Sequence, residues 1–390
     1  MRTQVAIIGG GPAGSLLSHL LDDEGIDNVV LEQRSRDYVL GRIRAGVIEH
    51  GTADVLRAAG LGERLDREGM IHEGVGLAFG GRRLRVDFAS LTGKYVMIYG
   101  QTQIQEDLYE AATARDARFV FEADDVALHD IQSESPWVTC TIDGASERLD
   151  CDFVAGCDGS HGVSPTVIPA GARRTFTRDY PFGWLGILSE TAPIDEELIY
   201  ANHERGFALC SMRHAHLSRY YVQCRLKDDI EDWSDDRFWS ELVSRLPAEA
   251  TADLETGPSI EKSITPLRSF VAEPMQWGRL FLAGDAAHTV PPTGAKGLNL
   301  ALGDVVYLSW AFRDHYHRAD DRGLEGYSDR ALLRAWKSVR FSWWMTTLLH
   351  RFPETDDGFD RRLQQTELEY LASSRAAQQS LAENYVGLPL

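Results

Sequence analysis

Three glycines near the start of the chain have the spacing of a phosphate-binding turn. Gly9, Gly11 and Gly14 follow an apolar run at residues 5–8 and precede a segment with the apolar spacing of a helix. Such a turn between a strand and a helix directs backbone N–H groups and the helix N-terminus at a pyrophosphate. Glu32 ends the next apolar run, where an acidic side chain can bind a ribose hydroxyl. These residues predict a dinucleotide site.

The overall charge is opposite to what an anionic ligand requires. The 390 residues carry a formal net charge of −19, which argues against nucleic acid as a partner. Local arginines must therefore reverse the field at a phosphate site. Arg42 and Arg44, in the segment "GRIRAG", follow the second apolar run closely enough to do so. We predict that both bind the cofactor.

Two further motifs follow predicted strands. The segment "CDG" contains Asp158, and the segment "GDAAHTVPPTGAKGLN" at residues 284–299 presents Asp285, Lys296 and Asn299 between prolines and glycines. Backbone of this composition lies close against a ligand. A nicotinamide dehydrogenase would use the same glycine turn for NAD. The single glycine fingerprint and the two extra motifs favour FAD.

These motifs need a sheet that brings the ends of several strands together. The first 32 residues have the order strand, helix, strand of a βαβ unit. Alternating runs follow up to about residue 226, Ser234 is placed to begin a helix, and the pattern after Leu298 is mostly helical. We predict a mixed α/β fold with a Rossmann-like FAD-binding domain (1–174), an inserted mixed-sheet substrate domain (175–278), and a return to the FAD domain with a helical, interface-forming C-terminal region (279–390).

Composition limits the remaining possibilities. No apolar run reaches the ~20 residues that span a bilayer, and residues 341–349, "FSWWMTTLL", are interpreted as a buried helix. The N-terminus has no cleavage site of a signal peptide. Five scattered cysteines predict reduced thiols in a cytoplasm and no metal site.

The three motifs, in this order, resemble the class A flavoprotein aromatic monooxygenases. Longer segments, among them "GRIRAGVIEHG", "ELIYANHERGFALCSMR" and "RFSWWMTTLLHRFP", resemble those members of the family that act on 4-hydroxybenzoate, and the likeness runs from residue 2 to the C-terminus. The resemblance implies hydroxylation of 4-hydroxybenzoate at the 3-position to 3,4-dihydroxybenzoate. It also implies FAD, NAD(P)H and O2, a flavin C4a-hydroperoxide, and a homodimer.

The resemblance assigns cofactor contacts residue by residue. It agrees that the glycine turn, Glu32, Arg42 and Arg44 contact FAD. It adds seven further FAD-contacting residues: Gln101, Asp158, Asp285, Lys296, Gly297, Leu298 and Asn299. Trp184 and Arg219 border the flavin. His161, Arg268 and residues 34–38 belong to the nicotinamide region. Gln33 stands where better-known members have an arginine, and Arg34 and Arg36 could still meet a 2′-phosphate, so we expect NADPH with NADH use possible.

The resemblance also assigns the substrate site. Ser211, Arg213 and Tyr221 hold the carboxylate, and Pro292 and Thr293 lie where substrate meets flavin and help to fix where oxygen is delivered. Tyr200 contacts the phenolic oxygen, with Tyr385 behind it and His72 at the outer end of a proton relay.

The chemistry requires these residue types. A phenol with a pKa near 10 needs help to ionise at neutral pH, and a buried tyrosine hydroxyl can stabilise the phenolate. A guanidinium grips a carboxylate through two parallel hydrogen bonds. By pattern alone, however, Tyr200 would be a core residue, His72 a surface residue and Tyr385 an anchor for the C-terminus.

Two other functions stay open. The same pocket could accept a related aromatic acid, such as an aminobenzoate or a dihydroxybenzoate. A flavoprotein fold can also serve a non-catalytic carrier, although such a protein should lack the intact glycine turn.

Overall fold

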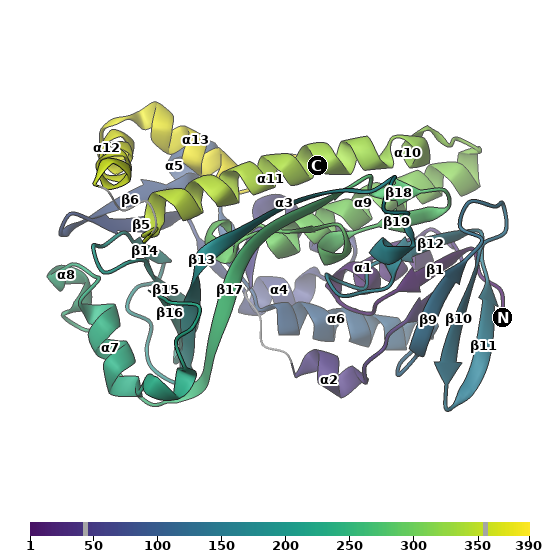
Figure 1. Ribbon diagram of the computed structural model, residues 1–390, viewed down its shortest axis with the longest axis horizontal. Coiled ribbons are helices and arrows are strands. Elements are labelled where there is room, and N and C mark those ends of the chain that lie inside the picture. The colour runs from purple at the N-terminus through teal and green to yellow at the C-terminus, as the bar shows by residue number, and fades with distance from the viewer. Residues whose placement is uncertain (42–45, 354–357) are drawn as a thin grey trace.

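The computed structural model describes residues 1–41, 46–353 and 358–390, so the predicted contacts of Arg42 and Arg44 lie outside the described residues. The long helix α11 (Tyr327–Leu349) runs across the molecule above the two longest strands (Figure 1), β13 (Arg174–Ser189) and β17 (Ser259–Glu273). These two strands pair antiparallel. They link the part of the molecule that contains the glycine turn to the part that contains the predicted substrate residues.

A six-stranded sheet holds the three cofactor motifs. Its order is β18 (Gln276–Trp277), β19 (Leu280–Leu282), β12 (Phe153–Gly156), β1 (Val5–Ile8), β2 (Asn28–Leu31) and β8 (Phe119–Val120). Strands β1, β2, β12 and β19 run parallel, and β1 is buried at every residue, as expected for a strand covered on both faces. The carboxyl ends of these strands therefore bring the glycine turn, Asp158 and Asp285 to one edge, although the motifs are far apart in sequence.

An eight-stranded sheet forms the predicted substrate region. Its order is β20 (His288–Thr289), β17, β13, β16 (Leu217–Cys224), β15 (Ala208–His214), β14 (Ile199–Ala201), β5 (Gly74–Phe79) and β6 (Arg82–Asp87). All neighbours pair antiparallel except β14 and β5. The sheet thus includes strands from residues 74–87 and 288–289 as well as from the predicted domain 175–278. The division at 174 and 278 stays a prediction.

Two three-stranded sheets complete the strand content of the described residues. One contains β3 (Val47–Glu49), β7 (Val96–Ile98) and β4 (Met70–His72), and the other contains β9 (Asp124–His129), β10 (Trp137–Ile142) and β11 (Ala145–Asp150).

The helices follow the predicted distribution. Those before β17 are α1 (Pro12–Asp23), α2 (Arg36–Leu40), α3 (His50–Ala58), α4 (Gly62–Glu68), α5 (Phe88–Thr92), α6 (Gln101–Ala114), α7 (Asp235–Val243) and α8 (Ala248–Thr251). The C-terminal part contains α9 (Gly297–Arg318), α10 (Arg322–Glu325), α11, α12 (Phe359–Ser373) and α13 (Arg375–Tyr385). Ser234 caps α7 by accepting a hydrogen bond from the backbone of Arg237. The predicted mixed α/β fold with a helical C-terminal region is confirmed.

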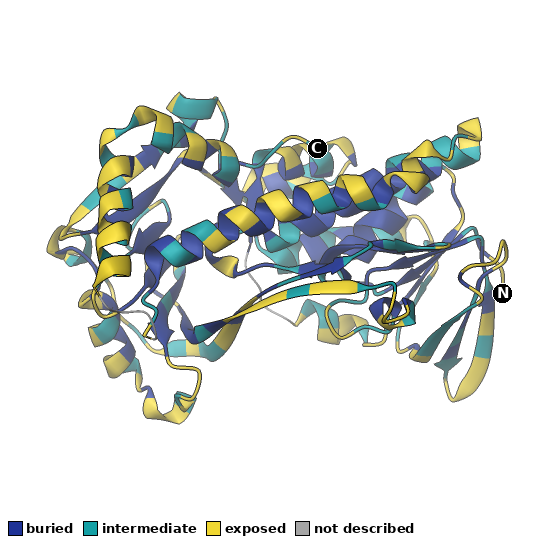
Figure 2. Cartoon of the chain, turned by 45° about the horizontal axis from the view of Figure 1, so that its top comes forward, coloured by how far each residue is buried: buried dark blue, intermediate teal, exposed yellow. Residues whose placement is uncertain are grey.

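Helix α11 is amphipathic along its whole length. Buried and exposed residues alternate on it in Figure 2, and Phe341, Met345 and Leu348 are buried on its inner side while Trp343 is 39% exposed. The interpretation of residues 341–349 as a buried helix therefore holds for one face only. In the described ranges, no helix combines the length and the apolarity that a bilayer-spanning segment requires. All five cysteines are free and buried.

Candidate active site

The glycine turn is built for close packing and for a ligand. A Cβ on Gly9, where φ is +102°, would lie 2.4 Å from the carbonyl oxygen of Cys157, and a Cβ on Gly14 would lie 1.9 Å from the carbonyl oxygen of Gly9. A Cβ on Gly11 would meet nothing within 4 Å. The first and third glycines are therefore required for packing the turn, whereas the second borders open space, where the pyrophosphate is predicted to bind.

Glu32 is held beside this turn. Its carboxylate accepts hydrogen bonds from the backbone N–H groups of Gly10 at 2.7 Å and of Arg34 at 2.8 Å. Both oxygens are oriented at the end of β2, where a ribose would lie, and the ribose contact itself stays a prediction.

Asp158 occupies the end of β12. It accepts a hydrogen bond from the backbone of Ser164 at 2.8 Å, and its Oδ1 is buried without a partner among the described residues. Burial raises the pKa of this carboxyl group. A Cβ on Gly162 would lie 2.0 Å from Cγ of Asp158, so this loop also depends on glycine for its close approach.

The turn that carries Asp285 is anchored by a buried ion pair. Oδ2 of Asp304, on α9, accepts hydrogen bonds from the backbone of Gly284 at 2.9 Å and from Nε2 of His288 at 2.6 Å. Burial acts to lower the pKa of His288, but the contact with Asp304 outweighs this effect and raises it. Neither residue had a predicted role, although His288 lies within the "GDAAH" motif. The pair fixes the position from which Asp285 would meet a flavin side chain.

We expect Asp304→Asn to weaken FAD binding and to lower the free energy of unfolding by about 2 kcal/mol, because a charge-assisted buried hydrogen bond is lost. Since the folded-state pKa of His288 is raised, its contribution is fully present below the unfolded value of about 6.5 and is lost as pH rises through the folded value. Urea unfolding and FAD fluorescence from pH 5 to 9 measure both effects. Asp314→Asn, in a partly exposed ion pair with Arg318 on the same helix, is the matched control. Equal changes in the two variants would contradict the anchoring role.

Two residues predicted for the nicotinamide region, His161 and Arg268, lie on the surface, and Gln101, predicted to contact FAD, begins a helix. His161 is exposed, with its Nδ1 3.0 Å from the hydroxyl of Ser160. The guanidinium of Arg268 is 3.3 Å from Asp179, and both side chains are exposed. Gln101 begins α6 directly after Gly100. The structure does not bring the first two residues into contact with the glycine turn, and all three assignments stay predictions.

Strand register places three of the predicted substrate residues, Tyr200, Ser211 and Tyr221, on one face of the large sheet. Tyr200 is opposite Leu209, Leu209 is opposite Tyr221, and Ser211 is opposite Arg219. Cross-strand partners share a face, and alternate residues of one strand do too. Tyr200 and Leu209 belong to one apolar cluster with Trp184, while their neighbours Ile199 and Cys210 belong to the cluster that α7 covers.

The ring of Tyr221 lies over a glycine. A Cβ on Gly186 of β13 would be 2.6 Å from Cε1 of Tyr221. The ring of Trp184 lies 5.0 Å from that of Tyr221, and its Nε1 donates to Nε2 of the buried His350 at 2.7 Å. His350 orients Trp184 through this hydrogen bond, although it had no predicted role.

Arg213 lies at the bulge of β15 between Met212 and His214. Its Nε and Nη1 are inaccessible to solvent and have no hydrogen-bond partner among the described residues. Burial lowers the pKa of its guanidinium, and the neighbouring Tyr221 opposes that shift. Because an arginine starts from a pKa above 12, the group keeps its charge at neutral pH. Buried donors on a charged group are best satisfied by an anionic acceptor, and a carboxylate is such a group.

Tyr200 and Tyr385 form a buried hydroxyl pair. Their oxygens are 2.7 Å apart, although the residues are separated by 185 positions. Burial raises the pKa of both groups, so both hydroxyls stay protonated near neutral pH. Phe88 stacks on Tyr385 with ring centres 5.0 Å apart and holds that ring in place.

His72 is enclosed rather than exposed. Its side chain is 1% exposed, and neither ring nitrogen has a hydrogen-bond partner among the described residues. Burial lowers its pKa to about 4. The surface position that its pattern suggested is wrong: His72 is buried at the end of β4, where it pairs with Val96 of β7. Its place in a relay stays a prediction.

The segment 291–299 bridges the two parts of the site. The hydroxyl of Thr293, next to Pro292, lies 2.9 Å from that of Thr346 on α11. Asn299 accepts from the backbone of Glu49 at 2.8 Å and, after Gly297 and Leu298 at the start of α9, ties the helix to β3.

Lys296 is tied to the C-terminal helix. Its Nζ is 2.7 Å from Glu49 and 3.0 Å from the carbonyl oxygen of Tyr385. Burial lowers the pKa of this lysine, and Glu49 opposes that shift. Glu49 lies in the segment "GRIRAGVIEHG" and had no predicted role. Its ion pair shows that Lys296 is charge-paired within the protein.

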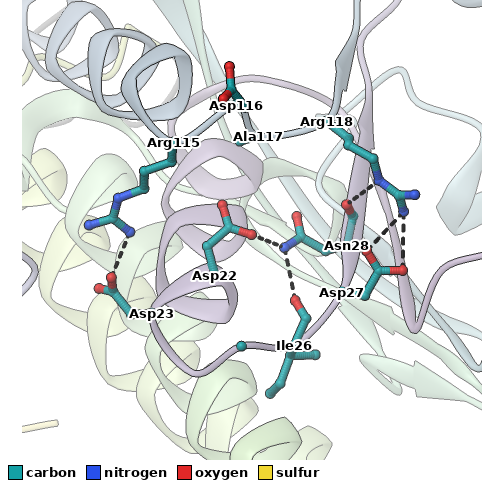
Figure 3. A pocket seen from close by; sticks show the side chains of 10 residues that line it. Asp22, Asp23, Ile26, Asp27, Asn28, Arg115, Asp116, Ala117 and Arg118 are labelled. Atoms are coloured by element: carbon teal, nitrogen blue, oxygen red, sulfur yellow. Dashed lines mark hydrogen bonds and ion pairs between the residues drawn. The ribbon is translucent and has the colours of Figure 1, made fainter.

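A separate surface groove of about 620 Å³ lies at the opposite edge of the six-stranded sheet, where α1 ends and β2 begins. Figure 3 shows two ion pairs in it, Asp23 with Arg115 at 2.6 Å and Asp27 with Arg118 at 3.1 Å, and a hydrogen bond between Asp22 and Asn28 at 2.7 Å. Ligands of such sheets bind at the carboxyl ends of strands. This groove is therefore not the cofactor site.

Comparison with known proteins agrees with this geometry. The FAD binding domain family matches residues 2–342. The p-hydroxybenzoate hydroxylase of Acinetobacter baylyi is 53% identical over 390 residues, which cover 100% of this chain and 96% of that protein. The chain belongs to the FAD binding domain family. This match confirms the predicted family of flavoprotein aromatic hydroxylases and the predicted FAD cofactor.

Two more distant relatives were also found. A 3-(3-hydroxy-phenyl)propionate/3-hydroxycinnamic acid hydroxylase of Burkholderia vietnamiensis is 26% identical over 329 residues, or 81% of this chain and 57% of that protein. The crystal structure of p-nitrophenol 4-monooxygenase from Pseudomonas putida covers 100% of both chains with a TM-score of 0.82 at 18% identity. At that identity the likeness shows a shared fold alone.

Proposed function

We propose that this protein is an FAD-dependent monooxygenase that converts 4-hydroxybenzoate to 3,4-dihydroxybenzoate with NAD(P)H and O2. The observation that carries the proposal is a buried guanidinium, Arg213 on β15, together with a buried hydroxyl pair formed by Tyr200 of the neighbouring strand β14 and Tyr385 of α13. The first suits a carboxylate and the second a phenol, the two ends of 4-hydroxybenzoate. The 53% identity to a p-hydroxybenzoate hydroxylase over the whole chain supports the same substrate.

When bound, the flavin supplies hydride acceptance and oxygen transfer. The chain orients the substrate and transfers its phenolic proton. Arg213, with Ser211 and Tyr221, anchors the carboxylate, so that the ring is held at a constant depth. Tyr200 accepts the proton of the phenol as it passes its own proton to Tyr385, and its hydroxyl then donates a hydrogen bond to the phenolate oxygen. Pro292 and Thr293 form the wall between ring and flavin, and Thr346 steadies that wall.

Product identification over a panel of benzoates tests the proposal. We expect a yellow protein whose NADPH oxidation is stimulated by 4-hydroxybenzoate and whose product co-elutes with 3,4-dihydroxybenzoate. A higher kcat/KM with an aminobenzoate or dihydroxybenzoate would favour the alternative substrate class. Absence of bound flavin would favour a non-catalytic carrier.

For the nicotinamide we propose NADPH, with some NADH use. Arg34 lies over the ring of Tyr38 at 5.3 Å and Arg36 over that of Tyr109 at 5.7 Å, which places two guanidinium groups beyond Glu32. Either can approach a 2′-phosphate. Steady-state kcat/KM with both nucleotides measures the preference, and a strong preference for NADH would overturn it.

We also propose a cytoplasmic homodimer. Leu333, Trp336 and Trp343 on α11 and Phe359 and Leu363 on α12 are exposed apolar residues, and a second copy would cover them. Light scattering after size-exclusion chromatography should give twice the mass of the chain, and Trp343→Glu should reduce the dimer fraction. A monomer at micromolar concentration would refute the dimer.

A further inference from the structure

A proton that reaches His72 needs an onward route to water. His72 is 1% exposed, so solvent cannot take the proton from it directly. The cross-strand partner of His72 is Val96 of β7, which carries no charge. The charged groups that act on His72 come instead from the loop before β14, which carries Asp195 and Glu197.

Two arginines lie across the strand that follows His72. A Cβ on Gly74 would be 2.8 Å from Cζ of Arg85, and a Cβ on Gly76 would be 2.6 Å from Nε of Arg83. The two glycines of β5 therefore leave room for both side chains to cross the strand. They direct the guanidinium groups toward the loop before β14.

That loop supplies two carboxylates. Arg85 binds Glu197 through two hydrogen bonds of 2.7 and 2.8 Å, and Arg83 forms an ion pair with Asp195. The backbone N–H of Glu197 donates to Oδ1 of Asp195 at 2.9 Å. The loop is joined to β5 by the hydrogen bond from Gly76 to the carbonyl oxygen of Leu198 at 2.8 Å. The arrangement is thus fixed relative to the strand that begins beside His72.

Both carboxylates are partly accessible to solvent, Asp195 more than Glu197. The side chain of Glu197 is 13% exposed and that of Asp195 is 26% exposed. Asp87 adds a third carboxylate, 3.0 Å from Arg85, so two guanidinium groups face three carboxylates. Burial lowers the pKa of His72, whereas Glu197 and Asp195 act in the opposite direction. The surplus negative charge favours a transient imidazolium.

We propose that Asp195 and Glu197 form the outermost stage of the proton relay, through which a proton leaving His72 reaches water. The proposal rests on the function proposed above, because it needs a phenol that ionises at Tyr200. The phenolic O–H bond breaks, one proton passes along the relay to solvent, and no atom changes oxidation state. Asp195 and Glu197 are positioning residues in this scheme, since neither touches the substrate.

Proton release on substrate binding tests the proposal. The FAD-loaded protein is mixed with 4-hydroxybenzoate without nicotinamide, and a pH indicator and phenolate absorbance are followed by stopped flow. We expect the variant carrying Asp195→Asn and Glu197→Gln to release the proton at least fivefold more slowly at pH 7, with FAD content and substrate affinity within twofold of the parent. Added imidazole should restore the rate. Glu369→Gln, which removes the partner of Arg82 on the same strand β6, is the matched control and should change nothing.

The outcomes separate the two proposals. If the double variant releases protons at the parent rate while His72→Asn is slow, the exit lies elsewhere and this inference is overturned. If His72→Asn is also as fast as the parent, the relay in the proposed function fails as well. If the double variant loses FAD, Asp195→Asn alone decides by the same measurement, since it keeps the Arg85–Glu197 pair. Proton release at the parent rate in Asp195→Asn would overturn the proposed exit through Asp195 and Glu197.

Discussion

Replacing Arg213 by alanine should weaken 4-hydroxybenzoate binding by about 2–5 kcal/mol, or roughly thirtyfold to several thousandfold, as when one partner of a buried charge pair is removed. The physical reason is that Nε and Nη1 of Arg213 are enclosed and have no acceptor among the described residues, so the substrate carboxylate would be their partner. Titration of FAD fluorescence with 4-hydroxybenzoate measures the change.

Two comparisons make the result specific to the carboxylate. Binding of phenol, which lacks this group, should differ by less than threefold between Arg213→Ala and the parent. The affinity of Arg213→Lys for 4-hydroxybenzoate should lie between those of the parent and Arg213→Ala, because lysine keeps the charge but loses the planar pair of donors. An unchanged affinity for 4-hydroxybenzoate in Arg213→Ala would remove the basis for placing the carboxylate at β15.

Replacing Tyr200 by phenylalanine should lower the rate of hydroxylation by about 10² near neutral pH, which is typical of the loss of one positioned proton-transfer group. The hydroxyl of Tyr200 is buried 2.7 Å from that of Tyr385, so its removal takes away both the donor to the phenolate and the path for its proton. Substrate affinity should change by only about threefold, because Arg213 is intact. Product formed per NADPH consumed, measured by HPLC, reports the effect.

The pH dependence distinguishes proton transfer from packing. A free phenol ionises near pH 10, so the defect of Tyr200→Phe should shrink as pH rises toward 9. Tyr220→Phe is the matched control: Tyr220 lies next in β16 to Tyr221, is fully buried, and faces the other side of the sheet. An equal loss in both variants, or a loss in Tyr200→Phe that is the same at every pH, would show that the hydroxyl of Tyr200 has no role in ionisation.

The cofactor half could be predicted from the sequence because its determinants are local. The spacing of Gly9, Gly11 and Gly14 specifies a turn whose shape depends on a few neighbouring dihedral angles. A buried parallel strand is recognised by its continuous apolar run. That β1, β12 and β19 end at one edge also follows, once the strands are known to be parallel.

The proton-transfer half could not be predicted in this way. By pattern alone His72 belonged on the surface and Tyr385 was an anchor of the C-terminus. Their positions depend on packing between segments far apart in the chain, such as α5 against α13. The roles of Asp304, Glu49 and His350 were missed for the same reason, since each acts through a partner on another element.

The sequence by itself determined the family, the flavin and the residue types of the site, because glycine spacing, strand pattern and long motifs are properties of neighbouring residues. Only the tertiary structure decided that Tyr200 meets Tyr385, that Lys296 is paired with Glu49, and that His72 is sealed from water. Such contacts follow from how sheets and helices close over one another. Burial then changes the charge state of each group, which no local pattern records.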